Sequence, residues 1–255
     1  MKISVVAGIG LLSLLLAGAG HGAELKVLSA IAMQPVMEDL GPKFEHATGH
    51  RVALTFATLG AAVKRVQDGE TFDVVIIPRS GTDGFVQEGK TSAGDVTIVA
   101  RSGMGVAVRK GAPRPDLSTP ADFKRMLLAA RSVTYSDPAH GGVGGIHVAR
   151  LLDRLGIAGE MKPKTVFLPQ AGAIGVLVAN GQADLAIGQI QELVAVPGIE
   201  VVGPLPADLQ NTIVFSAALM ARAKDIEAAR ALIGFLRSPE AATVMKAKGM
   251  DPAAP

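Results

Sequence analysis

One order of residues occurs twice in the chain and constrains its fold more than any other feature. A β-branched run leads through a Gly-Ala turn, a helical stretch, a glycine and an acid into a second apolar run, first over 55–77 and again over 166–187. The acids are Asp73 and Asp184. Short strands alternating with helices are typical of α/β folds. Two lobes built on one plan would explain the repeat, and a coincidence between two common strand-helix-strand units is the alternative.

Nine runs rich in β-branched residues predict strands, and helices fill most of the intervals between them. The predicted strands are 26–30, 51–56, 72–78, 95–101, 105–110, 132–136, 165–168, 183–189 and 212–221. We therefore predict an α/β protein of two lobes, each a central sheet flanked by helices. Lobe 1 is expected to contain 24–103 and 212–255, lobe 2 is expected to contain 104–211, and the chain would cross between them near Arg101 and Asn211.

The N-terminal segment has the pattern of a secretory signal. Lys2 supplies a positive charge, 3–16 is an apolar run, and small residues follow at 17–19 and 22–23. The apolar run is shorter than the about 20 residues that a transmembrane anchor needs. We predict that 1–23 is a cleavable signal peptide and that the protein is periplasmic.

Composition excludes several classes of protein. The net charge is only +2, so no basic surface is expected for nucleic acid. Cysteine is absent, which removes disulfides, lipidated cysteines and thiol nucleophiles. Aromatic residues make up 4% of the chain, too few for stacking platforms that hold sugars or quaternary amines.

The stretch GFVQEGKT, from Gly84 to Thr91, fits the nucleotide-binding pattern G-x-x-x-x-G-K-[ST]. A phosphate-binding loop must follow a buried strand and begin a helix. Here the order is reversed, because the stretch ends a predicted helix that begins near Ser80, and Gly89 stands where a helix stops. The context argues against ATP binding.

A second glycine-rich stretch, DPAHGGVGG over 137–145, follows a predicted strand and begins an amphipathic helix. The first turn of a helix has unpaired N–H groups and a partial positive charge, which together bind an anion without a lysine. Similar helix starts are predicted at 30–34, 56–60 and 169–172. We expect the four to face one cleft, although each alone is also an ordinary strand-to-helix turn.

Several ordered stretches resemble the molybdate-binding periplasmic proteins of ABC importers, and the resemblance covers nearly the whole chain after the signal. They are LSAIAMQPVMEDLGPKFEHATGHRVALTFATLGAAVKRVQDGETFDVVIIP, SDPAHGGVGG, GQADLAIG and IGFLRSPEAATVMKAKGM. The resemblance implies the type II periplasmic binding fold, in which two lobes close on a small solute and deliver it to a membrane permease.

In that family the oxyanion is held by N–H and hydroxyl groups at the helix starts and by a tyrosine of the second lobe. Carried over to this sequence, the binding positions are Ala32, Thr58, Gly144, Ala171 and Gln189. Met33, beside Ala32 in the same helix start, is a further candidate. An alanine replaces the expected serine at 32, and a glutamine replaces the tyrosine at 189. Each lost hydrogen bond to a charge costs about 1.5 to 3 kcal/mol, so we expect molybdate to bind less firmly here.

Two charged or titratable residues indicate a different, larger anion. Arg79 follows a predicted strand directly, at the edge where α/β ligand crevices open, and its guanidinium would suit a carboxylate. His140 lies in the glycine-rich loop and would donate to an anion. The alternatives are a solvent-facing arginine at a helix start and a surface histidine. Gln189 would read a polar edge of the ligand or simply face solvent.

Enzyme motifs are not evident. The histidines show no compact metal-binding spacing, and no G-x-S-x-G nucleophile motif occurs. We predict a monomeric solute-binding component of an ABC importer, without metal or cofactor, that binds a small oxyanion or organic carboxylate. The alternatives are a sensory receptor and a periplasmic enzyme using His140 and Asp137 as proton carriers.

Overall fold

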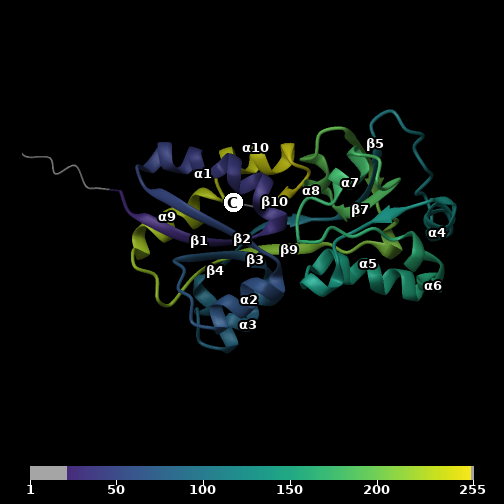
Figure 1. Cartoon of the computed structure of the whole chain (residues 1–255). Helices are drawn as coiled ribbons and strands as arrows, with labels where there is room; N and C mark the ends of the chain where they lie inside the picture. The colour runs from purple at the N-terminus through teal and green to yellow at the C-terminus, as the bar shows by residue number, and fades with distance from the viewer. Residues whose placement is uncertain (1–21, 254–255) are drawn as a thin grey trace, which may run out of the picture.

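The computed structural model describes residues 22–253, which form two sheets with helices on both faces of each (Figure 1). The larger sheet has six strands in the order β10-β4-β9-β3-β1-β2. Strand β1 runs parallel to β2 and β3, whereas β9 is antiparallel to both of its neighbours. The strands are β1 (Glu24–Ala30), β2 (Arg51–Ala57), β3 (Val74–Pro78), β4 (Val96–Ser102), β9 (Ile213–Leu219) and β10 (Asp251–Pro252).

The smaller sheet has four strands in the order β6-β7-β5-β8. They are β5 (Met104–Arg109), β6 (Val133–Thr134), β7 (Leu185–Gln189) and β8 (Ile199–Pro204). We call the six-stranded sheet with its helices lobe 1 and the four-stranded sheet with its helices lobe 2. The chain passes from lobe 1 to lobe 2 between Ser102 and Met104 and returns between Pro204 and Ile213.

Helices cover both sheets. In lobe 1, α1 and α10 lie on one side and α2 and α3 on the other, while in lobe 2, α7 and α8 lie opposite α5 (Figure 1). The α-helices are α1 (Gln34–Thr48), α2 (Leu59–Gln67), α3 (Arg79–Gln87), α4 (Pro120–Ala129), α5 (Val143–Arg154), α6 (Ala158–Met161), α7 (Gly175–Ala179), α8 (Ile190–Val194), α9 (Ile226–Phe235) and α10 (Pro239–Ala247). The short 3-10 helices are η1 (Ile31–Met33), η2 (Ala93–Asp95), η3 (Pro138–His140), η4 (Lys162–Lys164) and η5 (Ala207–Leu209). None of the described helices is both long and apolar enough to cross a membrane.

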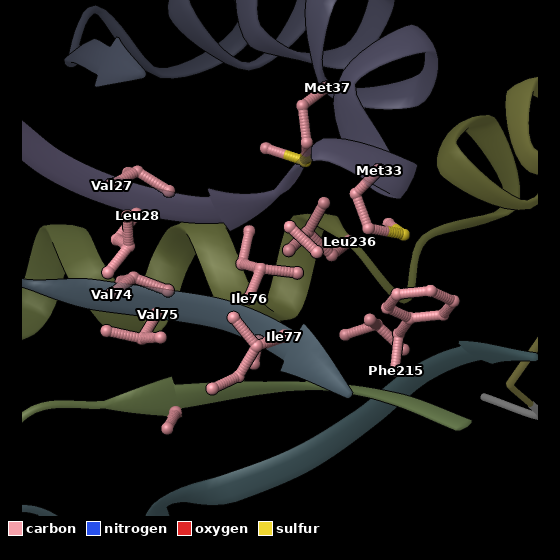
Figure 2. Close-up of a cluster of buried hydrophobic side chains, with 14 of the residues drawn as sticks. Val27, Leu28, Met33, Met37, Val74, Val75, Ile76, Ile77, Phe215 and Leu236 are labelled. Carbon is pink, nitrogen blue, oxygen red and sulfur yellow. The ribbon is translucent and has the colours of Figure 1, made fainter. Parts of the chain in front are cut away.

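The core of lobe 1 forms where the alternating side chains of β1 and β3 meet the apolar faces of the helices (Figure 2). All five residues of β3 are buried, as expected for a central strand covered on both faces. Met33, Met37 and Leu236 pack over this sheet, and Phe215 of β9 fills the end near the second lobe. Lobe 2 has its own cores on the two faces of its sheet.

In both copies of the sequence repeat, the acid forms hydrogen bonds to the beginning of the neighbouring parallel strand. Just before β3, the carboxylate of Asp73 accepts hydrogen bonds from the backbone N–H groups of Lys26 (2.7 Å) and Lys224 (2.6 Å). Just before β7, the carboxylate of Asp184 accepts from the backbone N–H of Arg131 (3.0 Å) and from its side chain. In both lobes the acid therefore ties its own strand to the beginning of the parallel neighbour.

The second copy departs from the prediction in its first half. The strand predicted over 165–168 is wrong, because only Thr165 pairs, in an isolated bridge with Val133. The chain then leaves the sheet, since Leu168 lines a cavity and Pro169 has no N–H to donate to a ladder. Consequently the following helix starts at Gly175, later than the predicted start at 169–172, and is only a short turn of helix.

The nucleotide-like stretch GFVQEGKT lies where the sequence predicted. Gly84 is inside α3, and Gly89 follows the end of that helix with a φ of 67°. A left-handed residue after the last turn is a common helix stop that favours glycine. The stretch therefore has the opposite geometry to a phosphate-binding loop.

Candidate functional site

A cavity lies between the lobes and holds about 640 Å³ of empty space, counting the part that opens to solvent. Lobe 1 supplies the ends of β1, β2 and β3 and the helix starts that follow them. The carboxyl ends of parallel strands are where α/β proteins bind ligands. The lining residues of lobe 1 are Ala30, Ile31, Ala32, Ala57, Thr58, Leu59, Pro78 and Phe215. Those of lobe 2 are Ser136, Asp137, His140, Gly142, Val143, Gly144, Leu168, Gln170, Ala171, Gly172, Ile174, Gln189 and Glu192.

Thr58 joins the two sides of the cavity. It is the N-cap of α2, where its hydroxyl accepts from the Ala61 N–H (3.3 Å), and the same hydroxyl donates to the carbonyl of His140 (2.6 Å). Next to it, the Gly60 N–H donates to the carbonyl of Gly141 (3.3 Å). The structure is therefore in a closed arrangement, with the start of α2 touching the glycine-rich loop of lobe 2.

The glycine-rich loop brings the start of α5 to the cavity wall. Gly144 and Gly145 are buried in the first turn of this helix. A Cβ on Gly145 would lie 1.9 Å from the carbonyl oxygen of Ser136, so only glycine lets the helix start pack so close to the chain leaving β6. The first N–H groups of α5 have no partner within the helix, and here they face a space lined by both lobes.

A buried amide network ties the cavity floor together. Gln191 is fully buried, and its Nε2 donates to the carbonyl of Ala32 (3.1 Å) and to Oε1 of Gln189 (3.2 Å). The hydroxyl of Ser102 donates to Oε1 of Gln191. Residues from lobe 1, from the crossing segment and from lobe 2 therefore meet at one side chain, which fixes the orientation of the Gln189 amide at the cavity.

Glu192 is the carboxyl group that the environment perturbs most. It lies in the first turn of α8, lines the cavity and is half-buried. Burial raises the pKa of Glu192 to about 7, although a hydrogen bond from the Gln189 backbone N–H opposes this shift. A glutamate at this position that reaches back to the N-cap N–H is half of a capping box. The group is thus able to hold or release a proton near neutral pH.

The cavity wall carries no lysine or arginine among the described residues. Its charged or titratable side chains are Asp137, His140 and Glu192. Asp137 is occupied as the cap of η3, where its carboxylate accepts from the Ala139 N–H (2.9 Å). An anion in this space therefore meets N–H groups, hydroxyls, amides and the ring of His140, and no lysine or arginine of the lining.

Six of the eight residues predicted to bind ligand lie on this cavity, namely Ala32, Thr58, His140, Gly144, Ala171 and Gln189. Met33 and Arg79 do not. Met33 is fully buried in the core of lobe 1, because its side chain points under η1 to the sheet (Figure 2). Arg79 is about half exposed and forms an ion pair with Asp83 (3.4 Å) along α3, so its guanidinium follows its own helix instead of entering the crevice.

Ser136, Gln191 and Glu192 are among the residues of the site that were missed in the sequence. Ser136 and Gln191 are small or polar residues in ordinary positions, and no local pattern distinguishes them. Glu192 carries a readable signal, because an acid three residues after the last strand residue, Gln189, is typical of a helix start. In the part of the chain that the structure describes, no group of three or more histidine and acidic side chains forms a metal site.

Comparison with known proteins places this geometry in a family. A family model for bacterial extracellular solute-binding proteins matches residues 25–251. An aconitate isomerase of a Pseudomonas species is 34% identical over 234 residues, covering 89% of this chain and 87% of that protein. The molybdate-binding protein ModA of Azotobacter vinelandii is 29% identical over 255 residues, covering 97% and 96%.

The solved structure of an Azotobacter vinelandii periplasmic molybdate-binding protein superimposes with a TM-score of 0.74 at 20% identity, covering 91% of this chain and 99% of that one. This agreement confirms the two-lobed type II periplasmic binding fold that the sequence predicted. It also agrees with the resemblance drawn from the ordered stretches. The chain therefore belongs to the family of bacterial extracellular solute-binding proteins.

Proposed function

We propose that the protein binds a small organic polycarboxylate between its lobes and delivers it to the permease of an ABC importer. The observation that carries this proposal is the mixed wall of the cavity. Ile31, Leu59, Leu168, Ile174 and Phe215 line it beside the helix starts. Apolar side chains match a carbon skeleton, whereas a tetrahedral metal oxyanion has none.

The polar residues of the cavity wall also support a carboxylate ligand over a metal oxyanion. Ala32 provides no hydroxyl, and the Thr58 hydroxyl already donates to His140. Amide and N–H donors remain at Gln189 and at the start of α5, and they suit carboxylate oxygens. The two relatives differ in ligand, since one is named for aconitate and the other for molybdate. The cavity favours the carboxylate.

The transport role rests on family membership and on the closed contact between the lobes. In this proposal the protein works in the periplasm as a monomer, and ligand binding stabilises the closed form that the permease recognises. A sensory receptor would use the same closed form for another partner. Permease and ATPase genes next to the gene for this protein favour transport.

Thermal unfolding of the chain from residue 24 tests the ligand class. The panel contains molybdate, tungstate, sulfate, phosphate, citrate, cis-aconitate and trans-aconitate. We expect a tricarboxylate to raise the unfolding midpoint most, since a ligand at 100 times its Kd adds about 2.7 kcal/mol to stability. Arg79→Ala is the matched control and is expected to leave this increase unchanged, because Arg79 lies outside the cavity. A midpoint that responds to molybdate or tungstate alone would refute the carboxylate proposal.

A second candidate function is isomerisation of an unsaturated carboxylate. It is favoured by the aconitate isomerase relative and by Glu192 and His140, which line the same cavity and are both able to transfer protons. One group would remove a proton from a carbon beside a carboxylate, the double bond would move by one position, and the proton would return at the far carbon. Proton NMR of cis-aconitate in D2O checks this: conversion with uptake of deuterium is the expected result, and unchanged spectra with bound ligand leave only the binding function.

A further inference from the structure

We propose that Glu192 enters the ligand complex as a neutral carboxylic acid that donates its O–H to the bound anion, so that each anion is bound together with one proton. This inference rests on the proposed function, because it requires a carboxylate in the cavity. It concerns how the site selects and releases that ligand.

The position of Glu192 makes contact with a cavity ligand possible. The residue is on the wall of the cavity, in the first turn of α8, and the backbone N–H of Gln189 holds its carboxyl group from one side. The same side chain also lines a second groove, which α1 of lobe 1 and the end of α8 form together. Glu192 therefore stands between the cavity and that groove, within reach of a ligand bound in the cavity.

The charges around Glu192 do not supply a counterion inside the cavity. The other titratable side chains of the wall are Asp137 and His140. In the second groove, Lys248 is paired with Asp39 (2.9 Å). The remaining charged side chains on the groove or on elements packed against α8 are Glu38 on α1, Arg109 on β5, where it donates to the carbonyl of Val178, and Glu200 on β8, where it pairs with Arg114.

An ionised Glu192 and a bound anion would repel each other in this partly desolvated space, whereas the acid form supplies a hydrogen-bond donor. Burial already raises the pKa of Glu192 to about 7 before any ligand is present. An anion stabilises the protonated form further, so above pH 7 binding must take up a proton. Affinity should then be nearly constant below pH 7 and fall by up to about tenfold per pH unit above it.

Isothermal titration calorimetry with citrate and trans-aconitate tests the proposal. Titrations between pH 7.5 and 9 keep the added ligand fully ionised, and repeating them in Tris and HEPES gives the number of protons taken up. For the wild type we expect about one proton per ligand at pH 8 and an affinity that falls about twentyfold over this range, as a group with a pKa of about 7 requires.

Two variants identify the group. Glu192→Gln keeps a donor at the same place, so we expect it to bind without proton uptake and with an affinity that changes less than about threefold over the same pH range. His140→Gln removes the other titratable group that can gain a proton here, and it should keep the wild-type pH dependence. A Glu192→Gln protein that still takes up a proton, or a His140→Gln protein that no longer does, overturns the assignment.

The calorimetry also separates this inference from the function on which it rests. Wild-type binding with no proton uptake, and with no change in affinity from pH 7.5 to 9, refutes the role of Glu192 while leaving carboxylate binding intact. The absence of any heat of binding from both ligands, with wild type that is folded by circular dichroism, refutes the proposed function and this inference together.

Discussion

At the scale of single residues, most polar side chains of the site already form hydrogen bonds to neighbouring residues, which leaves them fewer donors and acceptors for a ligand. Thr58 donates to His140, Gln189 accepts from Gln191, and Asp137 caps η3. Glu192 differs, because burial raises its pKa to about 7 and only the Gln189 N–H opposes this shift. Its carboxyl group is therefore able to hold or release a proton near neutral pH.

The free energy of unfolding of the unliganded protein should depend on whether Glu192 is protonated. Its folded-state pKa of about 7 lies above the usual value of 4.5, so the folded state binds more protons between these pH values and loses stability as pH rises through them. Glu192→Gln removes this loss. Thermal unfolding at pH 5 and pH 8.5 is expected to show a variant that gains, relative to wild type, about 2 to 3 kcal/mol at the higher pH. Parallel behaviour of the two proteins at both pH values would show that the carboxyl group is ionised throughout.

Single residues also mark the limit of sequence-based prediction. Three helix starts were predictable, and Ala32, Thr58 and Gly144 lie on the cavity for that reason, whereas Ala171 lies on it in the loop before α7. The error at Arg79 arose because position along a strand end does not determine where a long side chain turns, and Asp83 one helical turn later attracts it. The burial of Met33 depends on packing between η1 and the sheet, which no local pattern records.

At the scale of elements, each lobe uses one acid to join the starts of two parallel strands. The two acids differ in burial, since Asp73 is buried and Asp184 is only half-buried. Asp73 accepts from two backbone N–H groups, whereas Asp184 accepts from the backbone N–H of Arg131 and forms an ion pair with its exposed guanidinium. The guanidinium and N–H groups of Arg131 lower the pKa of Asp184. Surface pairs of this kind add little to stability.

Replacing each acid by alanine should therefore have unequal effects. Asp73→Ala leaves the N–H groups of Lys26 and Lys224 without their acceptor, and hydrogen bonds to a charged group contribute about 1.5 to 3 kcal/mol each, so we expect a loss of about 3 kcal/mol or more. Asp184→Ala is the matched comparison and is expected to cost on the order of 1 kcal/mol. Urea unfolding of both variants measures the difference. Equal losses would mean that burial of the acid is not what sets its contribution.

The elements also show why the repeat was predicted only in part. Glycine stops and acids are local features, and Gly69 and Gly181 both adopt positive φ, as their places in the pattern indicated. The first strand of the second copy failed because a β-branched run pairs only where a neighbour offers free backbone groups. Here Leu168 is turned to the cavity and Pro169 ends the pairing after a single bridge.

At the scale of the whole molecule, contacts between the start of α2 and the glycine-rich loop join the lobes beside the cavity. They include the hydrogen bonds from Thr58 to His140 and from Gly60 to Gly141. The order of the quoted stretches predicted the fold because their spacing covers most of the chain. It did not predict these contacts, the first of which joins residues 82 positions apart, because they depend on the final placement of two loops.

Thr58→Val should loosen this closed state. The variant loses the cap of α2 and the hydrogen bond to the His140 carbonyl. The bond between the lobes is worth about 0.5 to 1.5 kcal/mol, so we expect ligand affinity to fall about threefold to tenfold and the unliganded protein to have a larger radius of gyration. Thr58→Ser keeps the hydroxyl and should match the wild type. Calorimetry and small-angle X-ray scattering measure the two effects. Identical affinity and size in the valine variant would show that the bond does not contribute to closure.

The position of β9 in the larger sheet determines the order in which the two sheets can form during synthesis. All four strands of the smaller sheet lie within 104–204, so they can assemble as soon as that stretch has been synthesised. The larger sheet must wait, because Ile213–Leu219 is inserted between β3 and β4 and no earlier segment fills that gap. The half of the molecule that begins at the N-terminus is thus the last to be completed, and a nascent chain keeps the edges of β3 and β4 open until its final fifth emerges.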